Sequence, residues 1–160
     1  MRFLWVLLFV FVGYAVESVI KEIFGGWFCP NLLLILVVFF NLFKGIRYSI
    51  GTAVLAGLLK DSYSAGIFGQ HIFSFVLCAY LTVFIKTYLY HTSSHGSRVF
   101  FVFLVSFLNV LILYALNVML GSVSFVEMVS HVLVPEVLST TLVTPFVYRK
   151  YKQCALKLFA

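Results

Sequence analysis

Two carboxylates in this sequence stand beside unusual neighbours, and each could take part in chemistry. The first, Asp61, directly follows Lys60 at the end of an apolar stretch. It could cap the turn that follows through the amides of Ser62 and Ser64, or it could form an ion pair with Lys60. Proton or ion movement would require a second buried ionisable group within reach. If six helices span a membrane, the acidic candidates on the same membrane face as Asp61 are Glu17 and Glu22.

The second carboxylate, Glu136, follows Pro135 inside another apolar stretch. Pro135 has no N–H to donate to the carbonyl of His131, so that carbonyl would be freed within a helix. A charged Glu136 in the bilayer would cost about 2.5–3.5 kcal/mol, so it would be protonated, paired or facing a wet cavity. Thr140 and Thr144 extend the polar face at helical spacing. This face could form hydrogen bonds between helices, line a partner or ligand cavity, or relay protons.

The histidines, cysteines and serines form no recognisable catalytic or metal motif. His91 and His95 are four residues apart, but they lie in a Ser- and Gly-rich segment without a third ligand. The 3 cysteines have no CxxC spacing, which is typical of small apolar packing residues. No hydrolase-like arrangement and no glycine-rich phosphate loop occurs. We therefore expect no enzyme activity, no metal and no cofactor.

The composition indicates which elements must position these residues. Hydrophobic residues make up 63% of the 160 and charged residues 10%, and the mean hydropathy is +1.12. A soluble domain carries about a quarter charged residues, so 11 basic and 5 acidic side chains cannot cover an aqueous surface of this size. We predict an all-α polytopic membrane protein, a bundle of six transmembrane helices.

Charged residues and turns divide the chain into six apolar segments. The predicted helices span about 3–20, 30–43, 46–61, 70–90, 99–120 and 129–148, interrupted in the last by Pro135 and Pro145. Together they form one transmembrane domain, 1–148, and residues 149–160 form a basic cytoplasmic tail.

The third segment is short for a membrane span. Only twelve residues lie between Arg47 and Lys60, a rise of about 18 Å against a hydrocarbon core of about 30 Å. Either Lys60 snorkels and the helix extends over both ends, or the segment is a half-helix. The small residues of 62–69 predict a loop, which could be partly re-entrant.

The charges are divided unequally between the two faces that six spans would create. One face receives four of the 5 acids, namely Glu17, Glu22, Asp61 and Glu127, with Lys21 and Lys60. The other receives the remaining basic residues: Arg2, Lys44, Arg47, Lys86, Arg98, Arg149, Lys150, Lys152 and Lys157. Because basic residues accumulate on the cytoplasmic side, both termini are expected in the cytoplasm. The net charge of +6 is thus an orientation signal, with no nucleic-acid partner implied.

Two further sets of residues predict helix packing. Small residues recur every four positions, at Gly45, Ser49, Ala53 and Gly57. Such a stripe lets two backbones approach closely, either within the bundle or at an interface with a partner protein. Asn109 and Asn117 place amides on one face of the fifth helix, where each interhelical hydrogen bond is worth about 1 kcal/mol or less.

A spaced set of motifs in residues 28–90 carries a family resemblance. A proline opens the second helix in Pro30-Asn-Leu-Leu-Leu-Ile-Leu, and the basic turn Lys44-Gly-Ile-Arg47 follows. The element Gly57-Leu-Leu-Lys-Asp61 then precedes a loop that ends in Phe68-Gly69. This pattern resembles the bacterial rod shape-determining protein MreD family. Lys60 stands where the family pattern has an apolar residue.

The resemblance implies a non-enzymatic scaffold of the cell-elongation machinery in the bacterial cytoplasmic (inner) membrane. Its expected partners are an MreC-like single-pass protein, membrane lipid and, indirectly, MreB filaments, RodA and a class B penicillin-binding protein. The family fold also resembles the substrate-binding membrane subunits of energy-coupling-factor vitamin transporters. A transporter subunit is therefore the alternative function, although the short outer loops offer little to line or cover a vitamin pocket.

Overall fold

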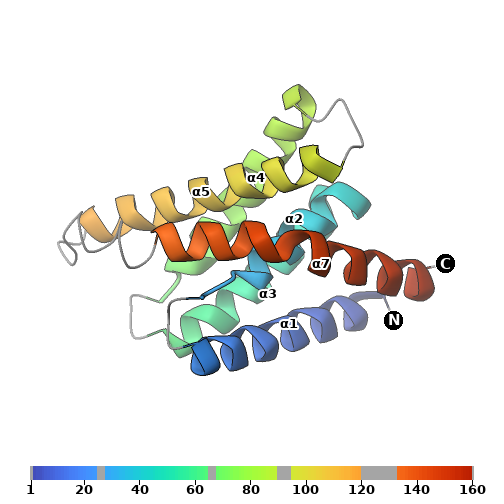
Figure 1. Cartoon of the computed structure of the whole chain (residues 1–160), viewed down its shortest axis with the longest axis horizontal. Helices are drawn as coiled ribbons and strands as arrows, with labels where there is room; N and C mark the ends of the chain where they lie inside the picture. Colours follow the sequence, from blue (N-terminus) through green and yellow to red (C-terminus); the bar gives the residue numbers. More distant parts are fainter. Residues whose placement is uncertain (1, 25–27, 65–67, 90–94, 120–132, 160) are drawn as a thin grey trace.

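The computed structural model describes residues 2–24, 28–64, 68–89, 95–119 and 133–159 (Figure 1). All the regular secondary structure in these residues is helical. Its elements are α1 (Arg2–Phe24), α2 (Leu32–Lys44), α3 (Ile46–Tyr63), α4 (Gln70–Leu89), α5 (His95–Met119) and α7 (Val134–Phe159). Two of them contain stretches long and apolar enough to cross a membrane, Gln70–Thr87 and Gly96–Met119, and α2 is a shorter apolar helix.

The shortest of these helices, α2, lies at the centre of the bundle. Every residue from Leu32 to Asn41 is buried, and α2 contacts α1, α3, α4, α5 and α7. A helix that is apolar on all sides is stable only when other helices surround it. At its carboxyl end Gly45 adopts φ +93°, a conformation that favours glycine, and the chain turns there into α3.

Three of the four small residues of the predicted stripe, Ser49, Ala53 and Gly57, are buried on α3, whereas a Cβ on Gly45, the residue before the helix, would meet nothing within 4 Å. The Ser49 hydroxyl donates to the carbonyl of Val37 at 3.0 Å and accepts from Asn41 Nδ2 at 3.3 Å. Ala53 is fully buried. A Cβ on Gly57 would lie 2.4 Å from the Cα of Ile72, so α3 and α4 touch backbone to backbone.

The helices are longer than the sequence predicted at several ends. α1 continues to Phe24, and α5 begins at His95, inside the expected polar connector. α3 has 18 residues and extends over both ends of the short segment. α7 runs through Pro145 without a break and includes most of the expected tail. The termini lie at the same end of the bundle (Figure 1).

Candidate functional site

The amino end of α2 is a point where several helices meet through polar side chains. Asn31 is the N-cap residue, and its Oδ1 accepts the Leu34 N–H at 3.2 Å. Its backbone N–H donates to Thr140 Oγ1 at 2.9 Å, and its Nδ2 donates to Glu136 Oε1 at 2.7 Å. One asparagine therefore caps the central helix and fastens α7 to it, although it lies more than 100 positions from α7 in the sequence.

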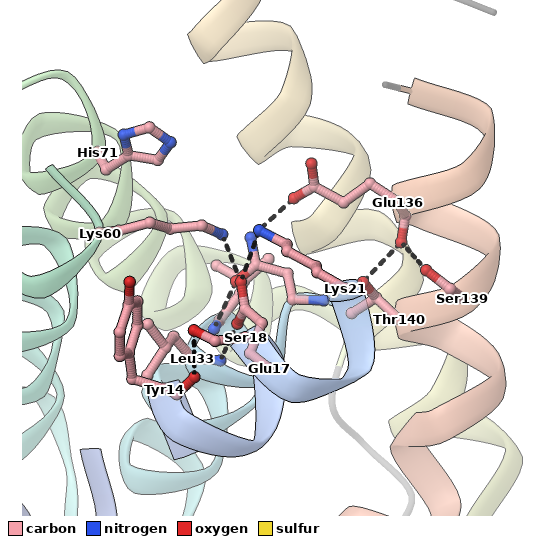
Figure 2. A network of polar contacts seen from close by, with 12 residues as sticks. Tyr14, Glu17, Ser18, Lys21, Leu33, Lys60, His71, Glu136, Ser139 and Thr140 are labelled. Carbon is pink, nitrogen blue, oxygen red and sulfur yellow. Dashed lines mark hydrogen bonds and ion pairs between the residues drawn. The ribbon is translucent and has the colours of Figure 1, made fainter. Parts of the chain in front are cut away.

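Glu17 brings α1 to the same point (Figure 2). Its Oε1 lies 3.1 Å from Lys60 Nζ and 3.3 Å from Lys21 Nζ, and its side chain is 2% exposed. Its Oε2 accepts the Leu33 N–H at 3.4 Å. The partial positive charge of a helix amino end favours a carboxylate there. We name Glu17, Lys21, Asn31, Lys60, Glu136 and Thr140 the amino-end cluster.

Lys60 resolves the question raised by the third segment. Its side chain is 13% exposed and reaches the Glu17 carboxylate instead of snorkelling to water. The ammonium also lies 5.5 Å from the centroid of the Phe75 ring. The ion pair ties α3 to α1. Removing one partner of such a pair would leave an uncompensated buried charge, which costs about 3–5 kcal/mol.

Asp61 caps α4. Its carboxylate oxygens accept the backbone N–H groups of Gly69 at 3.0 Å, His71 at 3.0 Å and Ile72 at 3.2 Å. His71 Nδ1 lies 2.8 Å from Asp61 Oδ1. The carboxylate thus binds amides at the start of the next helix, eight to eleven positions away, whereas the sequence suggested Ser62, Ser64 or Lys60. The carboxylate joins the ends of α3 and α4; the intervening residues 65–67 of the expected loop lie outside the described residues.

The remaining polar residues singled out in the sequence also lie between or along helices. Asn109 Oδ1 accepts the Ser74 hydroxyl at 2.6 Å, which links α5 to α4. Asn117 Nδ2 donates to the Leu113 carbonyl of its own helix at 2.9 Å. Pro135 is the second residue of α7, a position where the missing N–H costs little. The expected break therefore falls in the first turn of the helix, and His131 lies outside the described residues.

A groove lies between α1 and α7. Its volume is about 660 Å³. Phe9, Val12, Gly13 and Val16 line the α1 side at helical spacing, and Phe146, Val147, Arg149, Lys150, Tyr151 and Gln153 line the α7 side, with Leu32 between them. The rings of Phe9 and Tyr151 meet edge to face at 6.0 Å. We name this feature the α1/α7 groove.

Sequence reasoning missed the central role of Asn31. The available signal was an asparagine directly before the apolar run 32–43, which is the usual N-cap pattern. Its hydrogen bonds to Thr140 and Glu136 could not be predicted from the neighbouring residues, because both partners lie on α7, more than 100 positions away in the sequence. Among the described residues, no group of three His, Cys, Asp or Glu side chains is arranged to hold a metal.

The comparison with protein families decides the identity. The chain matches the family model of the rod shape-determining protein MreD over residues 1–153. It belongs to the MreD family. A search of curated proteins and a search of solved structures each find no match. MreD proteins are membrane proteins of the rod-shape machinery that includes MreC and MreB, so this chain has a role in determining rod shape. The resemblance seen in residues 28–90 is confirmed and extends over nearly the whole chain.

Proposed function

We propose that this chain is a non-enzymatic membrane scaffold whose α1/α7 groove receives the transmembrane helix of an MreC-like single-pass protein. Six helices cross the inner membrane with both termini in the cytoplasm. The bound partner then couples MreB filaments to RodA and a class B penicillin-binding protein. The observation that carries the proposal is the groove itself, a mostly apolar hollow between α1 and α7, whereas Ser49, Ala53 and Gly57 of α3 are buried within the chain.

The lining of the groove has the properties of a helix-docking surface. Val12 is 51% exposed and Phe146 is 71% exposed, although both belong to helices that pack on α2. Between them Gly13 is buried, and a Cβ there would meet the Tyr151 hydroxyl at 3.5 Å and the Leu33 side chain at 3.7 Å, so α1 packs closely on α2 and α7 at the floor of the groove. Helices associate in lipid through close packing around small residues, so an incoming helix gains most where such a hollow exists.

The amino-end cluster supports the same function by holding the two walls. Asn31 binds α7 to α2 through Glu136 and Thr140, and Glu17 binds α1 to α2 by accepting the Leu33 N–H. Both walls are thereby fixed to α2 at one end, and the contact between Phe9 and Tyr151 joins them towards the other. A preformed groove binds its partner with less loss of conformational entropy.

The vitamin-transporter alternative finds less support. A ligand site at the outer end of the bundle would need polar groups directed towards the ligand. In the amino-end cluster the carboxylates of Glu17 and Glu136 are engaged by Lys60, Lys21 and Asn31. These polar groups therefore serve to join helices.

Groove-filling variants test the proposal in cells that depend on this chain for rod shape. Val12→Trp fills the groove, and Val19→Trp places the same side chain on α1 at a position that is 54% exposed and outside the groove lining. We expect Val12→Trp to lose co-purification with the MreC-like protein and to give rounded cells, whereas Val19→Trp retains both. Equal behaviour of the two variants would contradict the proposed docking site. Mass spectrometry of the purified chain tests the alternative, because a retained vitamin-like molecule would overturn the scaffold proposal.

A further inference from the structure

A second hollow lies between α7 and the start of α5, and it shares Arg149 and Gln153 with the α1/α7 groove. Its volume is about 440 Å³. It is lined by Arg98, Val99, Thr144, Pro145, Tyr148, Arg149 and Gln153. We name it the α5/α7 pocket. Its described lining contains two guanidinium groups and no acidic side chain.

The position of the α5/α7 pocket is that of a membrane boundary. Arg98 is near the start of the membrane-crossing stretch Gly96–Met119. Arg149 directly follows Tyr148 on α7, at the beginning of the basic segment of that helix. A molecule between the two arginines would have its polar part at the interface, while Val99 and Pro145 would face its apolar part.

The arginine on α5 is held in place by an aromatic ring. The guanidinium carbon of Arg98 lies 5.3 Å from the centroid of the Tyr148 ring, and Tyr148 is buried. This cation–π contact orients a planar group that can donate two parallel hydrogen bonds to a phosphate. Gln153 adds an amide to the same lining.

We propose that the α5/α7 pocket binds the phosphate headgroup of an anionic phospholipid. The phosphate lies between Arg98 and Arg149, and the acyl chains leave the pocket along Val99 and Pro145 into the bilayer. Charge complementarity carries this inference, because basic pockets between membrane helices select anionic headgroups. A volume of about 440 Å³ suits a headgroup with its glycerol, and the apolar lining favours a lipid over free inorganic phosphate. The bound lipid bridges α5 and α7.

Lipid retention measured by native mass spectrometry tests the assignment. The full chain is purified in detergent and equilibrated with equal amounts of phosphatidylglycerol and phosphatidylcholine. We expect the wild-type chain to retain phosphatidylglycerol preferentially, and Arg98→Gln to lower its affinity by about fivefold or more, since each basic residue near an anionic headgroup contributes about 1 kcal/mol. Arg47→Gln is the matched control, because Arg47 is exposed at the start of α3 and outside the pocket lining.

A second variant separates loss of the pocket from loss of folding. Val99→Phe keeps both arginines and fills the pocket, and we expect it to lose phosphatidylglycerol selectivity while the thermal transition stays near that of the wild type. Equal retention of the two lipids by the wild-type chain would overturn the proposal. So would unchanged selectivity in both Arg98→Gln and Val99→Phe, or displacement of the lipid by inorganic phosphate. Arg98 and Val99 do not line the α1/α7 groove, so these variants leave partner docking intact if both proposals hold.

Discussion

The two sides of the central helix follow the same packing rule with opposite results. On one side, Gly57 brings α3 against α4 so closely that a Cβ would overlap the backbone of Ile72. On the other side, α1 and α7 both rest on α2 and leave the α1/α7 groove between them. Small residues thus close the first side within the chain, whereas on the second side the exposed side chains of Val12 and Phe146 line a hollow. The proposed partner surface therefore lies where packing within the chain is incomplete.

The largest effect is expected from removing the ion pair between Lys60 of α3 and Glu17 of α1. Lys60→Met leaves the buried Glu17 carboxylate without its nearest cation, and we expect a loss of about 3–5 kcal/mol in the free energy of unfolding. Lys21→Met is the control, because Lys21 is 44% exposed and its pair is worth about 1 kcal/mol or less. The free energy of unfolding is measured by denaturant titration in detergent. Equal losses in the two variants would show that burial does not determine how much the Lys60–Glu17 pair contributes to stability.

The contact between α3 and α4 is tested by adding a single methyl group at Gly57. Gly57→Ala forces α3 and α4 apart, and we expect it to cost about 1–3 kcal/mol. Gly96→Ala is the matched control on α5, where a Cβ would meet nothing within 4 Å. Thermal unfolding of both variants measures the difference. A Gly57→Ala variant as stable as the control would show that α3 and α4 can move apart at little cost in free energy.

The attachment of α7 to the amino end of α2 is tested at Asn31. Asn31→Ala removes the N-cap of α2 and the donor to Glu136, and we expect a loss of about 1–2 kcal/mol in the free energy of unfolding. Thr87→Ala removes an exposed hydroxyl that bonds only within its own helix among the described contacts, so it serves as the control. A loss no larger than that of Thr87→Ala would show that Asn31 does not contribute measurably to the attachment of α7.

The smallest effect on stability is expected from filling the groove. Val12→Trp adds a large side chain to a half-exposed position, and we expect the free energy of unfolding to stay within about 0.5 kcal/mol of the wild type. The same chain should lose partner binding, which distinguishes an open surface from a packed one. A large loss of stability would instead place Val12 in the closed core.

Local patterns predicted much of the helical content. The apolar runs of α2, α4 and α5 are visible as charge-free stretches, and the basic turn between α2 and α3 lies where the sequence placed it. The ends of α1, α5 and α7 differ because polar residues next to an apolar run can continue a helix. Neither Pro145 nor Lys60 ends its helix: α7 continues through Pro145, and Lys60 forms an ion pair with Glu17.

The candidate site could be predicted only in part. Asp61, Glu136 and Thr140 stood out because polar groups inside apolar stretches are costly. Their partners did not, since Asn31 joins Glu136 across 105 positions and Lys60 joins Glu17 from another helix. The small residues of α3 were visible, but the sequence left open whether they face the bundle or a partner.

By itself, the sequence determined that this chain is a helical membrane protein of the MreD family, because hydropathy and motif spacing are local properties. Only the tertiary structure decided that α2 is the central helix, that Ser49, Ala53 and Gly57 are used internally, and that α1 and α7 enclose a groove. The physical reason is that lipid and protein interior are both apolar. A membrane helix therefore carries little periodic signal to tell its packed face from its exposed one.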